Sequence, residues 1–146
     1  MHVPNNAFVV VADGEKMLFF RNDGDGEYPR LSVERKRLQD NPPDRDQKSD
    51  GPGRAIASVG GGRSAYEETD YHQLEEDRFA AETAELLKQR ALRNDYERLI
   101  VVAPPRTLGE LRKHYHKEVE RRLAGEIAKD LTGHPVEEIE RILLAQ

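Results

Sequence analysis

The sequence predicts an α/β fold in which helices cover both faces of a mixed sheet, and three observations lead to this prediction. Residues 99–103 form an unbroken apolar run, LIVVA, which a strand carries when both of its faces are covered. Residues 7–12 and 16–21 are β-rich runs separated by an Asp-Gly pair, as in an antiparallel hairpin. Residues 70–93 bring apolar side chains back at a helical period.

Composition limits the size of the fold and the kinds of partner. The chain has 146 residues, which predicts a single domain over residues 1–146. Its net charge of −5 argues against binding of nucleic acid through the overall charge of the molecule. A local basic patch is compatible with this net charge. There is no cysteine, and no apolar run is long enough to span a membrane. Without a recognisable signal peptide, we expect a cytoplasmic location.

The first two strands are expected at residues 7–12 and 16–21. They are joined by Asp13 and Gly14, a pair that favours a type I′ turn because both central residues of that turn need positive φ. The two strands are therefore predicted to be antiparallel neighbours.

A third, half-exposed strand is expected at residues 28–37. Leu31 and Val33 alternate with polar residues there, and Pro29 suits the start of a strand or an edge position. Residues 39–66 then become rich in Pro, Gly, Asp and Ser and contain few large apolar groups. This composition predicts a long mobile loop, because little apolar burial is available to offset the entropy of ordering it.

The second half begins with the helix predicted over residues 70–93, for which Thr69 or Asp70 is expected to provide the cap. The apolar strand at residues 99–103 follows and ends at two prolines, which have no N–H to donate to a sheet. Thr107 and Glu110 then have the spacing of a capping box, which predicts that a helix starts there.

The segment at residues 119–131 supports two interpretations. Apolar residues recur there every four positions, which favours a helix, but part of the segment also alternates as a strand does. A last helix is expected after His134 and Pro135. If the ambiguous segment is a strand, the order is β-β-β-α-β-α-β-α, which is the order of a ribonuclease H-like mixed sheet.

Three stretches of the sequence resemble a known family. They are DGPGRA at residues 50–55, LIVVAPPRTLGELR at 99–112 and EIAKDLTGHPVEEIERIL at 126–143. They resemble the bacterial host attachment protein family, which is similar to the middle domain of archaeal and eukaryotic peptide-chain release factors. The resemblance implies a ribonuclease H-like fold and a strand at about residues 121–128.

A two-metal nuclease is the enzyme that such a fold first suggests. Its mechanism needs several carboxylates that converge on the metal ions. The middle of the first strand and the end of the central strand carry apolar residues and proline instead, and Asp13 belongs to a turn that favours Asp for backbone reasons. We therefore predict no catalytic residues, no metal site and no cofactor.

The first candidate RNA-binding element is a glycine loop with two arginines. In release factors a Gly-Gly-Gln loop before the long helix enters the peptidyl-transferase centre, but this chain has no glutamine at the comparable place. The resemblance therefore implies an RNA contact rather than hydrolysis, whereas composition alone favours a disordered linker. The candidate residues are Arg54, Gly60, Gly61, Gly62 and Arg63.

The second candidate is a group of basic residues on and after the helix that follows the central strand. They suit phosphate groups, whereas the alternating glutamates favour an ordinary solvated helix face. The group consists of Arg106, Arg112, Lys113, Lys117, Arg121 and Arg122.

Two functions remain open from the sequence. In the first, the protein is a non-catalytic module that binds the ribosome or tRNA. In the second, which the host attachment resemblance implies, it is a regulatory or interaction protein with cytosolic protein partners that affects bacterial attachment to host cells indirectly.

Overall fold

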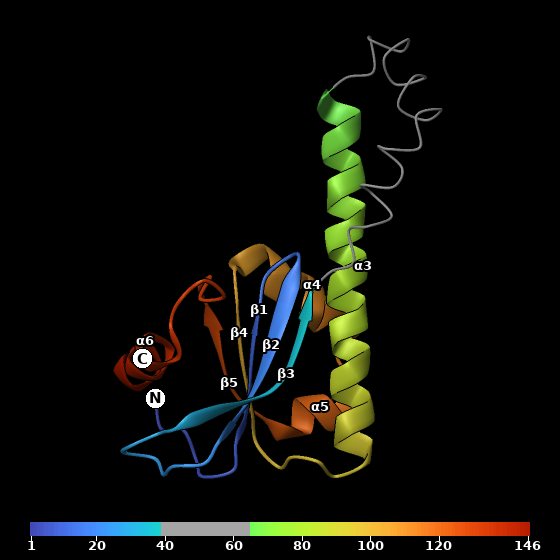
Figure 1. Cartoon of the computed structure of the whole chain (residues 1–146). Coiled ribbons are helices and arrows are strands. Elements are labelled where there is room, and N and C mark those ends of the chain that lie inside the picture. Colours follow the sequence, from blue (N-terminus) through green and yellow to red (C-terminus); the bar gives the residue numbers. More distant parts are fainter. Residues whose placement is uncertain (39–64) are drawn as a thin grey trace.

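The computed structural model describes residues 1–38 and 65–146, so the predicted loop and its candidates Arg54, Gly60, Gly61, Gly62 and Arg63 lie outside the described residues. Five strands form one mixed sheet in the order β3-β2-β1-β4-β5 (Figure 1). The strands are β1 (Phe8–Ala12), β2 (Lys16–Asn22), β3 (Leu31–Leu38), β4 (Leu99–Ala103) and β5 (Leu123–Ala128). β1 to β3 pair antiparallel, whereas β4 pairs parallel with both β1 and β5. The α/β prediction is confirmed.

Four helices of the described chain cover the two faces of this sheet. They are α3 (Ala65–Leu92), α4 (Pro105–His114), α5 (Lys117–Arg122) and α6 (Val136–Ala145). Apolar side chains of α3, α4 and α5 share one hydrophobic cluster with the sheet, and those of α6 share another. α6 therefore lies on one face and the other three helices on the opposite face (Figure 1).

The unbroken apolar runs of β1 and β4 follow from this layering. Phe8, Val10 and Ala12 pack on the α3 side, while Val9 and Val11 pack on the α6 side. Every residue of β1 and β4 is buried. Because the two strands lie next to each other with both faces covered, no position in either strand suits a polar residue.

The β1–β2 hairpin is confirmed, but its turn is not type I′. None of the described glycines has positive φ, which a type I′ turn would require at Gly14. The Asp13 carboxylate instead accepts hydrogen bonds from the backbone N–H groups of Glu15 and Lys16, both at 2.7 Å. Side-chain bonding of this kind fixes the turn without left-handed backbone geometry.

α3 is longer than predicted and extends beyond the sheet (Figure 1). It begins at Ala65, so Thr69 and Asp70 lie inside the helix and the predicted cap is wrong. Among its described side chains, those buried against the sheet lie between Phe79 and Ala91. Before Phe79, none of the described α3 side chains is buried, although Glu76 lies close to Gly14 in the β1–β2 turn.

Both interpretations of the ambiguous segment are correct in part. Residues 117–122 form the short helix α5, and β5 begins at the next residue. The strand implied at about residues 121–128 is thus present at Leu123–Ala128. No helix within the described parts of the chain is long and apolar enough to cross a membrane.

Candidate nucleic-acid interface

α4 starts directly at the end of the central strand. Pro104 is its N-cap residue and Pro105 occupies the first helical position, where a proline loses no hydrogen bond. No side chain of the described residues caps this end, so the capping box predicted for Thr107 and Glu110 is wrong. The fixed φ of proline moved the start of the helix two residues toward the N-terminus.

α4 presents one apolar and one cationic side. Leu108 and Leu111 are buried against the sheet and α3, whereas the basic side chains of the last turn point away from the core. We use the name α4–α5 face for the exposed cations of the two helices, which are Arg106, Arg112, Lys113, Lys117 and Arg121.

A short turn joins α4 to α5. Tyr115 has extended backbone geometry and ends α4. His116 is the N-cap residue of α5, and its Nδ1 accepts a hydrogen bond of 3.0 Å from the backbone N–H of Glu118. The cap satisfies one of the free N–H groups at the start of a helix only six residues long.

Three cations of this face form ion pairs in which the cation lies outside and the carboxylate beneath it. The side-chain exposed fractions are 55–70% for the cations and 18–25% for the carboxylates. The pairs are Arg112–Glu126 at 2.9 Å, Lys113–Glu110 at 2.7 Å and Arg121–Glu118 at 2.7 Å. Solvent therefore meets mainly guanidinium and ammonium groups, although the pairs are neutral in sum.

The pairing also strengthens the charged states. The hydrogen bond to Glu126 raises the pKa of Arg112, and the hydrogen bond to Glu110 raises the pKa of Lys113. The hydrogen bond from Arg122 holds the pKa of the Glu118 carboxyl below its usual value. Arg112, Lys113 and Glu118 are therefore ionised at neutral pH.

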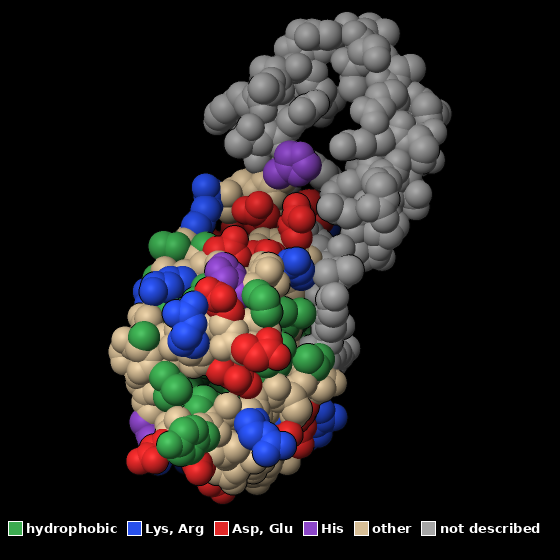
Figure 2. All heavy atoms as spheres, turned by 60° about the vertical axis from the view of Figure 1, so that its left-hand side comes forward, with side chains coloured by type: hydrophobic (Ala, Val, Ile, Leu, Met, Phe, Trp, Pro, Cys, Tyr) green, Lys and Arg blue, Asp and Glu red, His purple; other side chains and the backbone are tan. Residues whose placement is uncertain are grey.

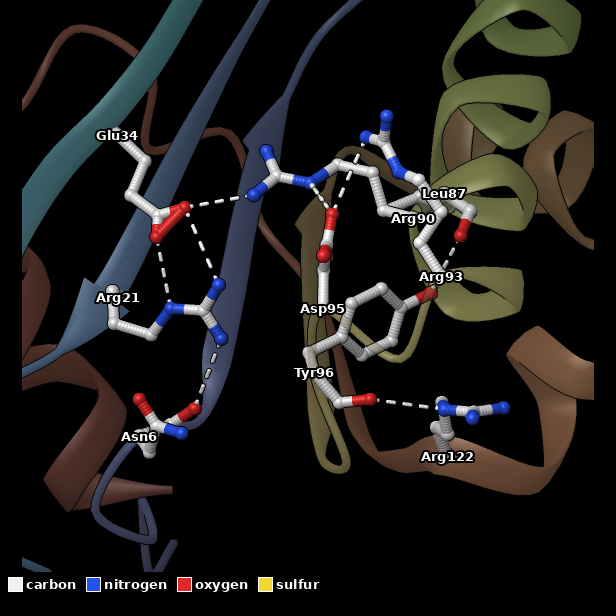
Figure 3. A network of polar contacts seen from close by, with 9 residues as sticks. All are labelled: Asn6, Arg21, Glu34, Leu87, Arg90, Arg93, Asp95, Tyr96 and Arg122. Atoms are coloured by element: carbon white, nitrogen blue, oxygen red, sulfur yellow. Dashed lines mark hydrogen bonds and ion pairs between the residues drawn. The ribbon is translucent and has the colours of Figure 1, made fainter.

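Arg122 is the exception among the predicted basic residues, because it is buried. Its side chain is 10% exposed and donates to the Tyr96 carbonyl at 2.9 Å (Figure 3). It also donates to Asn94 Oδ1 at 2.7 Å and to Glu118 Oε1 at 2.8 Å. Its Nη1 also donates to the Glu118 carbonyl at 3.1 Å, so four guanidinium hydrogen bonds go to protein acceptors. The prediction that Arg122 belongs to an exposed patch is wrong, and its role is to join α5 to the loop after α3.

Charge is distributed unevenly between the helices. Residues 105–122 contain six Lys or Arg and three Glu, whereas residues 72–82 of α3 contain four acidic residues and one Arg. Figure 2, which brings the α6 side forward, shows acidic and basic side chains intermixed, with carboxylates gathered near its upper end. Of the described helices, α4 and α5 carry the clearest cationic excess.

Sequence reasoning missed two residues of this face. Glu126 of β5 accepts from Arg112 and also from the Tyr115 hydroxyl, at 3.2 Å. Burial raises the pKa of the Tyr115 phenol, and the negative Glu126 adds to this shift. A buried, neutral hydroxyl therefore holds the carboxylate in place, a contact that becomes visible once α4 is known to pack beside β5.

The described residues contain no group of three or more His, Cys, Asp or Glu placed to hold a metal ion. Asp13 is occupied by its turn, and its second carboxylate oxygen accepts a 2.7 Å hydrogen bond from the Thr132 hydroxyl. Of the predicted basic residues, those of the α4–α5 face remain exposed to solvent.

These features define a mixed α/β domain with a cationic helical face. Comparison with protein families matches residues 6–143 to the bacterial archaeo-eukaryotic release factor family 12, which covers nearly the whole chain. The chain belongs to this family, and the predicted relationship to release factors is confirmed. A comparison with curated proteins finds no match.

Proposed function

We propose that this protein is a non-catalytic binding module that associates with the ribosome or tRNA, with the α4–α5 face as its RNA contact. The observation that carries the proposal is the group of exposed cations on α4 and α5 in a chain whose net charge is −5. Phosphate contacts dominate the affinity of proteins for RNA, and exposed Lys and Arg are the residues that make them. Membership of a release-factor family supports RNA of the translation machinery as the partner.

The same proposal includes a ribonuclease H-like fold. It is supported by the sheet order β3-β2-β1-β4-β5, by the antiparallel start and by the parallel pairing of β1, β4 and β5. In this arrangement the nuclease carboxylates would have to stand in the middle of β1 and at the end of β4. β1 consists of FVVVA and β4 runs into Pro104, so the framework is used for binding.

Ribosome co-sedimentation at low and high salt tests the proposal. We expect the protein to sediment with ribosomes at low salt, and binding to weaken steeply as salt rises. The double variant Arg112→Gln/Arg121→Gln should lose most of the binding. Arg141→Gln is the matched control, because Arg141 is equally exposed on α6 and also pairs with a glutamate three residues away.

Absence of co-sedimentation at every salt concentration would contradict the proposal. It would favour instead the regulatory protein that affects host attachment, for which an attachment defect in a deletion strain is the corresponding test. Acceleration of peptidyl-tRNA hydrolysis above the uncatalysed rate would contradict the non-catalytic part of the proposal alone.

A further inference from the structure

The ion pairs of the α4–α5 face differ from ordinary surface pairs in how their carboxylates are held. Two of the three carboxylates have a second donor below the surface. Glu126 accepts from the Tyr115 hydroxyl as well as from Arg112, and Glu118 accepts from the buried Arg122 as well as from Arg121. Among exposed pairs elsewhere, the carboxylate varies from 19% exposed in Arg78–Glu75 on α3 to 41% exposed in Arg141–Glu138 on α6.

We infer that Glu110, Glu118 and Glu126 are positioning residues, which hold Lys113, Arg121 and Arg112 ready to contact the phosphodiester backbone of RNA. This inference rests on the proposed function and adds a role in RNA binding for the acidic residues that pair with the cations. A free Arg or Lys side chain loses much rotamer entropy when it is fixed by a ligand. A side chain that is already held loses less on binding, so the contact is tighter.

The geometry leaves donors available for the phosphate. Arg112 uses Nε and Nη2 on Glu126, and Arg121 uses Nη2 on Glu118. Among the described residues, the remaining guanidinium nitrogens of these two arginines have no hydrogen-bond partner, and both side chains are more than half exposed. Arg106 and Lys117 have no ion pair within the described part of the chain, so they add charge without such positioning.

The glutamates can affect RNA binding through positioning of the cations or through their negative charge alone, and the two roles predict opposite effects when a glutamate is neutralised. If the glutamates only reduce the positive potential, neutralising any of them should strengthen RNA binding. If they position the cations, neutralising Glu126 or Glu110 should weaken binding. Glu120 is the matched control, because it is exposed on α5 and has no ion pair with any described residue.

The experiment measures the affinity of the full chain for a fluorescein-labelled RNA hairpin by fluorescence anisotropy at several salt concentrations. We expect Glu126→Gln and Glu110→Gln each to weaken binding about threefold to tenfold and to reduce the slope of log K against log salt by nearly one contact. Glu120→Gln should bind more tightly than the wild type. In an Arg112→Gln background, Glu126→Gln should cause no further loss, because the side chain that it positions is gone.

The outcomes separate the inference from the proposed function. If all three glutamine variants bind more tightly, the inference is overturned while RNA binding stands. If the wild type does not bind the hairpin or ribosomes, both are overturned. A thermal melt of each variant checks folding. If Glu126→Gln is unfolded, Glu110→Gln gives the test, because within the described part of the chain the Glu110 side chain has Lys113 as its single partner.

Discussion

Arg121 and Arg122 are adjacent in sequence but lie in opposite environments. The side chain of Arg121 is 70% exposed, whereas that of Arg122 is 10% exposed and donates to groups of three other residues. One of these groups is the side chain of Asn94, whose positive φ of 59° places it in the turn after α3. Arg122 therefore fixes the path of the chain from α3 into β4.

Replacing Arg122 by leucine should strongly destabilise the fold. The change leaves the Tyr96 carbonyl and Asn94 without their donor in a buried place, and we expect a loss of about 2–4 kcal/mol in the free energy of unfolding. Arg121→Leu, the control, should change it by less than about 1 kcal/mol because exposed ion pairs contribute little. Urea denaturation measures both, and equal losses would contradict the assignment of Arg122 as structural.

Glu34 lies between two arginines near the C-terminal end of α3, one of which is Arg90 in its last turn. Its carboxylate accepts from Arg21 at 2.8 Å and from Arg90 at 2.9 Å (Figure 3). Both guanidinium groups lie over the ring of Phe8. Burial alone would raise the pKa of Glu34, but the hydrogen bonds and charges of the two arginines outweigh it and lower the pKa below its ordinary 4.5.

This shift predicts a pH dependence of stability. A carboxyl group whose pKa is lowered by folding stabilises the folded state fully above its unfolded pKa, and this contribution is lost as the pH falls through the folded value. The difference in unfolding free energy between wild type and Glu34→Gln should therefore be largest at neutral pH and shrink below about pH 4.5. Urea denaturation across this range checks it, and a difference independent of pH would contradict the ionised network.

At the scale of elements, two glycines differ in the space available for a Cβ atom: Gly109 in α4 has room for it and Gly24 in a loop does not. A Cβ at Gly109, inside α4, would meet no atom within 4 Å. A Cβ at Gly24, in the loop between β2 and β3, would lie 2.2 Å from the Tyr28 carbonyl oxygen and 2.8 Å from the Arg30 nitrogen. These neighbours are backbone atoms, so they cannot move aside easily.

Alanine at the two positions should have opposite effects on stability. Gly109→Ala should stabilise the protein by about 0.5–1 kcal/mol, because alanine is the better helix former. Gly24→Ala should destabilise it by about 1–3 kcal/mol through the backbone clash. Thermal unfolding of both variants measures these changes, and a destabilising Gly109→Ala would mean that α4 does not pack as described.

The elements that could be predicted from the sequence are those with a local signal. β1 and β4 follow from apolar runs, and the hairpin follows from Asp13 and Gly14. The details that failed depend on competing local chemistry. The side chain of Asp13 replaced the expected type I′ backbone, and Pro105 started α4 before Thr107 could cap it.

The segment at residues 117–128 could not be resolved by periodicity. α5 ends at Arg122 and β5 begins at Leu123, so no turn residue marks the boundary. The apolar positions Val119 and Leu123 then fit a helical spacing although they belong to different elements. The family resemblance indicated the strand because it rests on long matching stretches of sequence, whereas periodicity rests only on the spacing of apolar residues.

At the scale of the whole molecule, the candidate site was predicted in composition but not in arrangement. Five of the six basic residues lie on the α4–α5 face, and the sixth is buried by partners 26 and 28 residues away in sequence. Glu126, whose carboxylate is covered, belongs to β5, and an acidic residue in a strand does not by itself indicate an ion pair with a helix. Contacts of this kind depend on tertiary packing and leave no local pattern.

The molecule also separates its charges. α4 and α5, which carry the exposed cations, pack against α3, whose residues 72–82 include four acidic residues and one arginine. A polyanion should therefore approach the α4–α5 face and be repelled by the extended part of α3. The net charge of −5 does not oppose this, because screening at physiological salt limits electrostatic interactions to about 8 Å.

Amide NMR of the labelled protein during titration with a short RNA hairpin tests the central claim most directly. We predict chemical-shift changes confined to residues 106–122 and the neighbouring Glu126, which decrease when salt is raised. Shift changes centred on residues 72–82 or on α6, or no changes at saturating RNA, would contradict the assignment of the α4–α5 face as an RNA contact.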